Sequence, residues 1–463
     1  MKKWENLKVL FCFCALLSVS GLSADEITQP SIEEQRRDIL NYGTENEIAE
    51  LIRTLRAENS DALDSEIMAT ASGIKNGRIL SGIFGFFANR DKGGLEERAR
   101  EVLEYWDEQV PEAVRAALEY LGQLRDTGAV DRIMTLIDEG DARYTNSAVR
   151  ALGRAGAPLK DQDRNESDLI AGYLIAYFED KFPGEDTARE IITALGSLEN
   201  PLAVAFLNSI AGNSDERPAR RMAAIQALSR IGDREGLGAV LEALNSPDPN
   251  LRSTAVAALG PFSGREVDQA ILEAFRDTYY RSRIGAAQAA AERKMEEAIP
   301  YLRYRAERDE VAAVKDEAIK ALGAMDRNDA YQIVASLFFE RKNTDRVRVV
   351  AGEVLINNRA GEYAERFIAE LDEAREKNQT ALYSQFCRII AQAETDKVEP
   401  LALRFFSTGG VVEKAYAIDM VYRNNLMGLI DHVRALAGEG SSLSRKARDT
   451  LRRMGVPFDE GTT

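Results

Sequence analysis

The sequence predicts an all-α protein, an α-solenoid of about eleven helical hairpins with a divergent helical cap at its N-terminal end. Strong helix formers dominate a chain of 463 residues that has only 12 prolines. The pattern AIQALS at 224–229 returns as AVAALG at 255–260, and apolar residues around both copies recur every three or four positions. That spacing marks one face of an α-helix. A helical unit that returns at such a period is typical of a repeat array, in which each hairpin packs on its neighbours.

Residues 1–24 have the pattern of a secretory signal peptide. Three lysines stand within the first eight residues, residues 9–17 are apolar, and Leu22, Ser23 and Ala24 provide small residues for cleavage near Ala24. An uncleaved N-terminal anchor is the alternative, although this apolar stretch is shorter than the roughly 20 residues of a membrane span. No later apolar segment is long enough to span a membrane. The sequence therefore predicts an exported, periplasmic protein.

Charge and cysteine content exclude some functions. The formal net charge is −16, and removing three Lys and one Glu with residues 1–24 lowers it to −18. Such acidity opposes nucleic-acid binding, which depends on cationic contacts with phosphate. Beyond the signal only Cys387 remains, so no intrachain disulfide is expected. Its place on an apolar stripe predicts a buried, inert thiol.

Residues 25–110 form the divergent cap, because their helices do not fall into the repeat register. Helices are predicted at 45–58, 65–74 and 78–87. The last contains the apolar run Ile83 to Phe87, for which two interpretations stay open. It either belongs to a buried capping helix, as expected at the end of a repeat array, or forms a patch for peripheral membrane or partner contact.

Residues 111–455 follow a regular register. Alanine often stands four positions before the marked apolar residue, where a small side chain lets helices approach closely. A glycine directly follows five marked residues, a position suited to a left-handed helix end. Asp248 before Pro249 predicts a helix start. The marked residues are Leu121, Leu152, Leu195, Leu228, Leu259, Ala291, Leu322, Leu355, Ile390, Val421 and Leu451.

Two segments depart from this register. The polar stretch 157–168 lengthens one interval, and it is expected to be either a binding loop or a tolerated surface loop. After a final helix at 444–454, residues 456–463 form a polar tail that is expected to fray.

The residues resemble the HEAT-like repeat, an armadillo-like helical repeat. Asp248 to Arg252 followed by Ala255, Ala258, Leu259 and Gly260 is similar to its acidic residue, its apolar-Arg pair and its A-x-x-A-L-G helix. The resemblance covers about 112–455. Repeats of this kind also occur in bilin lyases of cyanobacteria, so the resemblance implies a fold and not an activity. Tetratricopeptide repeats fit less well, because their Trp, Gly, Tyr and Pro positions do not recur.

The sequence offers no catalytic, cofactor-binding or metal-binding set. It has a single histidine, His432, whereas histidine is the usual base near neutral pH and the commonest metal ligand. No nucleophile motif and no glycine-rich phosphate loop is present. The 76 Asp and Glu residues are spread along helix faces, so no carboxylate pair stands out.

One candidate partner-binding surface stands out near the middle of the array. A core stripe of Ile299, Leu302 and Ala306 leaves other side chains of the same helix together on another face, and more Tyr and Arg residues lie just upstream. Tyr and Arg often supply most of the binding energy of protein interfaces. Alternatively, the tyrosines fill space between hairpins and the arginines pair with acidic neighbours. The candidate residues are Tyr279, Tyr280, Arg283, Tyr301, Tyr304, Arg305 and Arg308.

These observations predict an exported, non-catalytic scaffold that holds protein partners on the curved surface of the solenoid. Two alternatives remain. An envelope-associated structural protein would use the run Ile83 to Phe87 at a membrane. A lyase or hydrolase on a HEAT-like solenoid would need convergent carboxylates in a cleft.

Overall fold

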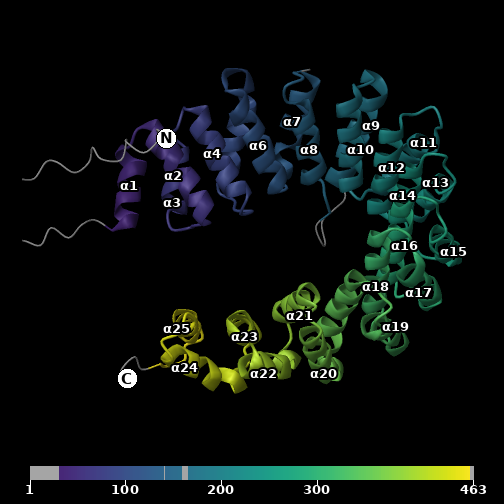
Figure 1. Cartoon of the computed structure of the whole chain (residues 1–463). Helices are drawn as coiled ribbons and strands as arrows, with labels where there is room; N and C mark the ends of the chain where they lie inside the picture. The colour runs from purple at the N-terminus through teal and green to yellow at the C-terminus, as the bar shows by residue number, and fades with distance from the viewer. Residues whose placement is uncertain (1–30, 140, 159–164, 459–463) are drawn as a thin grey trace, which may run out of the picture. The chain divides into compact units, whose positions relative to one another are not determined.

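The computed structural model describes residues 31–139, 141–158 and 165–458. They form 25 α-helices and seven short 3₁₀ helices, with no strand within these ranges, which confirms the all-α class (Figure 1). The predicted signal peptide lies outside the described residues, as do 159–164 of the predicted insertion and 459–463 of the tail. Contacts between residues divide the chain into two units, Met1–Leu124 and Arg125–Thr463.

The first unit contains the three helices predicted for the cap and three more. Ser31 and Thr44 begin α1 and α2 with reciprocal capping boxes to Glu34 and Glu47. Contacts group α6, which carries the first marked residue, with the cap helices. The helices are α1 (Ile32–Tyr42), α2 (Glu45–Glu58), α3 (Asp64–Ala71), α4 (Gly77–Ala88), α5 (Glu96–Glu104) and α6 (Pro111–Gln123).

The apolar run on α4 is buried. Ile83, Phe84, Phe86 and Phe87 are each at most 1% exposed, and α4 packs against α2 and α6. The prediction that this run lies on a buried helix is confirmed. The alternative membrane patch is wrong as a description of this surface, because the side chains that it requires face the core.

The second unit consists of helices that stack in two rows. First helices of successive hairpins contact one another, and second helices pack mainly against the first helix of the following hairpin (Figure 1). The first helices are α8 (Thr145–Ala155), α10 (Glu185–Ser197), α12 (Pro218–Ile231), α14 (Pro249–Ala257), α16 (Tyr280–Glu292), α18 (Ala312–Ala324), α21 (Thr380–Gln392), α23 (Val411–Asn424) and α25 (Ser444–Arg453). The second helices are α7 (Val130–Asp138), α9 (Asn165–Lys181), α11 (Val204–Gly212), α13 (Leu237–Ala243), α15 (Arg265–Ala274), α17 (Ile299–Arg308), α19 (Asn328–Phe339), α22 (Glu399–Thr408) and α24 (Ile430–Gly438).

One further hairpin is merged into a single element, α20 (Asp345–Glu376), whose two halves meet at Arg359 with non-helical φ −139° and ψ 32°. The predicted start at Asp248 is confirmed, since its side chain accepts a hydrogen bond from the Asn250 amide at 2.9 Å. The end of the insertion is helical from Asn165 onward. Within the described ranges, no helix is both long and apolar enough to cross a membrane.

The marked residues form the core, with one correction. Ten of the eleven predicted positions are fully buried at 0% exposure. The exception is Ala291, which is partly exposed, while Ala290 is fully buried. The true register therefore passes through Ala290, which places Arg283 seven positions before it, as Arg252 stands seven before Leu259.

The glycines after the marked residues do not end helices in the left-handed conformation, so that prediction is wrong. Within the described residues their φ angles are not positive. Instead, Gly153 and Gly196 lie where the next first helix crosses. A Cβ on Gly196 would stand 2.7 Å from the Cα of Ala227. The left-handed residue comes three positions later and is often not glycine: Glu199, Gly232, Lys294, Asp326, Asn425 and Gly455.

Candidate partner-binding site

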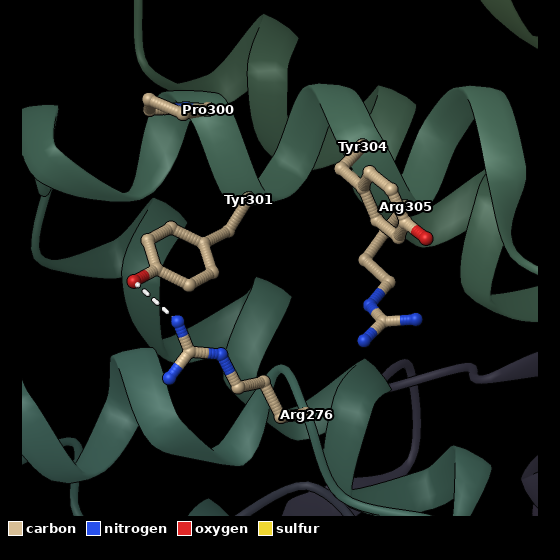
Figure 2. A pocket seen from close by; sticks show the side chains of 5 residues that line it. All are labelled: Arg276, Pro300, Tyr301, Tyr304 and Arg305. Carbon is tan, nitrogen blue, oxygen red and sulfur yellow. Dashed lines mark hydrogen bonds between the residues drawn. The ribbon is translucent and has the colours of Figure 1, made fainter.

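A pocket of about 420 Å³ opens on the second helix α17 of the predicted cluster (Figure 2). Pro300, Tyr301, Tyr304 and Arg305 line it from α17, and Arg276 lines it from the residues just after α15. In Figure 2 the guanidinium group of Arg276 reaches the hydroxyl of Tyr301, and Arg305 lies beside Tyr304. Two aromatic rings and two guanidinium groups therefore meet around one open space.

The helical period sets this arrangement. Ile299, Leu302 and Ala306 are at most 7% exposed and fix α17 against the core. Tyr301 and Tyr304 then fall on the outer side of the helix, as predicted. Arg308 is exposed one turn further along α17 and does not line the pocket.

The two tyrosines differ in their support. The Tyr301 ring packs 5.6 Å from the Phe275 ring, and the Arg276 guanidinium lies 5.6 Å from the centre of the Tyr301 ring. Tyr304 is 59% exposed, with the Arg305 guanidinium 5.3 Å from its ring centre. The pocket thus has one anchored ring and one ring that faces solvent.

Sequence reasoning missed Arg276. It precedes Arg308 by 32 positions, a typical hairpin interval, and Asp277 precedes Asp309 by the same number. In a stacked array, equivalent positions of neighbouring hairpins lie near each other. Extending the cluster by one interval along the second helices would have added Arg276.

The residues upstream of α16 form a separate group. The Tyr279 hydroxyl donates to the Asn250 side chain at 3.0 Å, and its ring packs 5.3 Å from the Tyr280 ring. Neither tyrosine lines the pocket. The structure therefore brings together only Tyr301, Tyr304 and Arg305 of the predicted residues.

Arg283 is not a surface residue, which corrects the prediction for it. Its side chain is 5% exposed. It donates to both carboxylate oxygens of Asp309, at 2.8 and 2.9 Å, and to the carbonyls of Asp277 and Thr278. The alternative interpretation, an arginine paired with an acidic neighbour, is correct at this position. Arg252 binds Asp277 in the same way one hairpin earlier.

Asp309 also receives a contact from the pocket. Arg305 reaches its carboxylate at 3.2 Å, so one buried carboxylate serves two guanidinium groups. Burial raises the pKa of Asp309, but hydrogen bonds from Arg283 and the Val311 amide outweigh this effect and hold that pKa below its usual value. Asp309 is therefore ionised, and the three side chains Arg283, Arg305 and Asp309 together carry one net positive charge.

Two other reactive side chains, His432 and Cys387, lie outside the pocket. His432 is exposed and stacks on Phe406 with ring centres 5.4 Å apart. Cys387 is 2% exposed, and burial raises the pKa of its thiol to about 12, which confirms the buried thiol. Among the described residues, no three His, Cys, Asp or Glu side chains are placed to hold a metal ion.

Comparisons with known proteins agree with this architecture. A family model described as spirochaete HEAT repeat protein matches residues 40–450. An uncharacterized phycocyanin operon protein Z of Pseudanabaena tenuis (strain PCC 7409) is 25% identical over 161 residues, which are 29% of this chain and 80% of that protein.

Two solved structures align with most of this chain. Kap95 in the Kap95:Nup1 complex aligns with a TM-score of 0.53 at 11% identity, over 91% of this chain and 64% of that chain. Kap121p aligns with a TM-score of 0.43 at 13% identity, over 90% of this chain and 53% of that chain. This chain therefore spans about half to two thirds of the length of these structures. At 11% identity the likeness to Kap95 concerns the fold alone.

Proposed function

The chain belongs to the spirochaete HEAT repeat protein family, and from this membership we propose that it is a non-catalytic scaffold that holds a protein partner. Each hairpin contacts only its neighbours, so the stack has long rows of outward-facing side chains. Kap95, which has this fold, was solved in a complex with Nup1. Proteins of this architecture can therefore hold a partner by surface contact.

The pocket beside Tyr304 is the observation that carries the proposal. Tyr304 is 59% exposed although it is a large aromatic side chain, and the Arg305 guanidinium lies 5.3 Å from its ring centre on the same second helix. Interface energy concentrates on Tyr and Arg residues that a partner can cover. The partner is therefore proposed to contact α17 and the end of α15.

Export to the periplasm is part of the proposal. It rests on the basic start, the apolar run and the small residues of positions 1–24. The acidic net charge of −16 favours protein over nucleic acid as the partner. Cell fractionation with N-terminal sequencing tests this point, and an intact N-terminus on a cytoplasmic protein would contradict it.

Affinity purification from cells tests the scaffold. Tyr304→Ala with Arg276→Glu is the suitable variant, because the Arg276 side chain is 63% exposed, whereas Arg305→Glu would add a charge beside the buried Asp309. The control is Tyr422→Ala with Arg303→Glu, which changes the same residue types outside the pocket. We expect the first variant to lose partners that the wild type and the control retain. Identical partner sets from a folded pocket variant would refute the proposal.

A further inference from the structure

The pocket beside Tyr304 also indicates what part of a partner it accepts. We infer that it binds a carboxylate group that stands next to an apolar side chain in an extended segment of the partner. This inference rests on the proposed scaffold function and specifies the ligand of the same site.

The positive charge of the pocket is incompletely balanced. Among the described residues, the ion-pair partner of Arg276 is Glu273, at 3.4 Å, and the two side chains are 63% and 61% exposed. Such surface pairs contribute little stability. Arg305 shares Asp309 with Arg283. Asp277 accepts hydrogen bonds from Nε and Nη2 of Arg252, at 2.8 and 3.0 Å. The balance favours an incoming anion.

The tyrosines hold the guanidinium groups ready for such a ligand. Arg276 and Arg305 lie against the Tyr301 and Tyr304 rings, which limits their rotation before binding. A guanidinium group on a ring still presents N–H donors at its edge, and these match the two oxygens of a carboxylate. The Tyr301 hydroxyl, 3.5 Å from Arg276, adds another polar group.

The pocket also has an apolar lining, which the partner would cover with a side chain next to its carboxylate. Pro300 and the Tyr304 ring are exposed, and covering them favours an aromatic or aliphatic side chain. A second pocket of about 440 Å³ shares Arg276 and has an apolar part formed by Leu241, Leu244 and Val256. Its lining also includes the carboxylates of Glu266, Glu273 and Asp277. An extended segment is therefore a better fit than an isolated anion.

A polyanion is the weaker candidate. The chain has a net charge of −16, and the field of the two pocket arginines is screened beyond about one Debye length, roughly 8 Å. A single carboxylate meets only this local field, whereas a nucleic acid would extend over acidic surface. Phosphate serves as a competing probe in the test.

Peptide binding measured by fluorescence anisotropy with the purified full chain tests the inference. The labelled probe is the peptide acetyl-Ser-Phe-Glu-Phe-Ser-amide. A second peptide has Gln in place of Glu, and a third peptide has Gln together with a free C-terminal carboxylate. We expect the Glu peptide to bind about tenfold more tightly than its Gln counterpart, as for a charged hydrogen bond. Preference for the third peptide instead would assign the carboxylate to a chain end.

Matched variants locate the effect. Arg276→Gln should abolish the preference for the carboxylate, while Arg303→Gln, an exposed arginine on the same helix paired with Glu307, should keep it. Equal binding of charged and uncharged peptides overturns the inference, and so does a preference that survives Arg276→Gln or stronger competition by inorganic phosphate than by acetate. If the variant Tyr304→Ala with Arg276→Glu loses its natural partners but the wild type binds the Glu and Gln peptides equally, only the inference of a carboxylate ligand is rejected. A peptide preference without partner loss would reject only the scaffold.

Discussion

Arg283 and Asp309 form a bidentate ion pair inside the second unit, with Nε–Oδ2 at 2.8 Å and Nη2–Oδ1 at 2.9 Å. The two side chains are 5% and 1% exposed. Asp309 follows α17 directly, and Arg283 lies in the first turn of α16, so the pair joins both ends of one hairpin. The pair also lies directly behind the pocket, because Arg305 contacts the same carboxylate.

Breaking this pair should destabilise the fold. Arg283→Met leaves the buried carboxylate of Asp309 with Arg305 as its remaining cationic partner, and we expect a loss of about 3 kcal/mol in the free energy of unfolding. The control is Arg305→Met, which removes the more exposed partner and should cost about 1 kcal/mol or less. Denaturant unfolding measures both, and equal stability of the two variants would contradict the assignment.

Acid should remove part of the stability through the same carboxylate. The pKa of Asp309 lies below its usual value in the folded chain. The stability that this carboxylate contributes is therefore complete above the unfolded pKa of about 3.9, and it is lost as the pH falls through the folded pKa. We expect the melting temperature to fall below about pH 4. The fall should be shallower in Arg283→Met, in which this pKa is no longer lowered as far. Parallel curves would argue against the linkage.

The register of α16 can be tested at two adjacent alanines. Ala290 is fully buried, whereas Ala291 is partly exposed. Ala290→Asp places a charge in the core and should lower stability by several kcal/mol or prevent folding. Ala291→Asp should cost about 1 kcal/mol or less. Circular dichroism melts distinguish them, and the reverse order would restore the register predicted from the sequence.

Glycine substitutions should act in opposite directions at two helical positions. Alanine is favoured over glycine in a helix by about 1 kcal/mol, and at Gly172 on α9 an added Cβ meets no atom within 4 Å. Gly172→Ala should therefore stabilise. At Gly196 the Cβ would stand 2.7 Å from the Cα of Ala227, so Gly196→Ala should destabilise by about 1–2 kcal/mol net. Stabilisation by both would mean that α10 and α12 approach less closely than described.

Most of the fold could be predicted because its signal is local. Apolar spacing identified the hairpins, and ten marked residues are fully buried. The register slipped at Ala291 because the run GAAQAAAE has no large residue to mark its core position. The break at Arg359 was missed because α20 has no proline there. The role of Gly196 depends on a neighbouring helix that the sequence does not place.

The site could be predicted only in part, for a related reason. Spacing along one helix placed Tyr301, Tyr304 and Arg305 on a common face. It could not show that Arg283 turns inward, since its partner Asp309 is 26 positions away. Arg276 belongs to the preceding hairpin, and only the stacking brings it to Tyr301.

A photo-crosslinking amino acid in place of Tyr304 tests the central claim most directly. Irradiation of cells that make this chain should produce one dominant crosslinked protein, identified by mass spectrometry, and Arg276→Glu should abolish that product. The same amino acid in place of Tyr422, which is 41% exposed on another helix, should not yield it. No crosslink at position 304, or the same product from both positions, would contradict the claim that a partner docks on the pocket between α15 and α17.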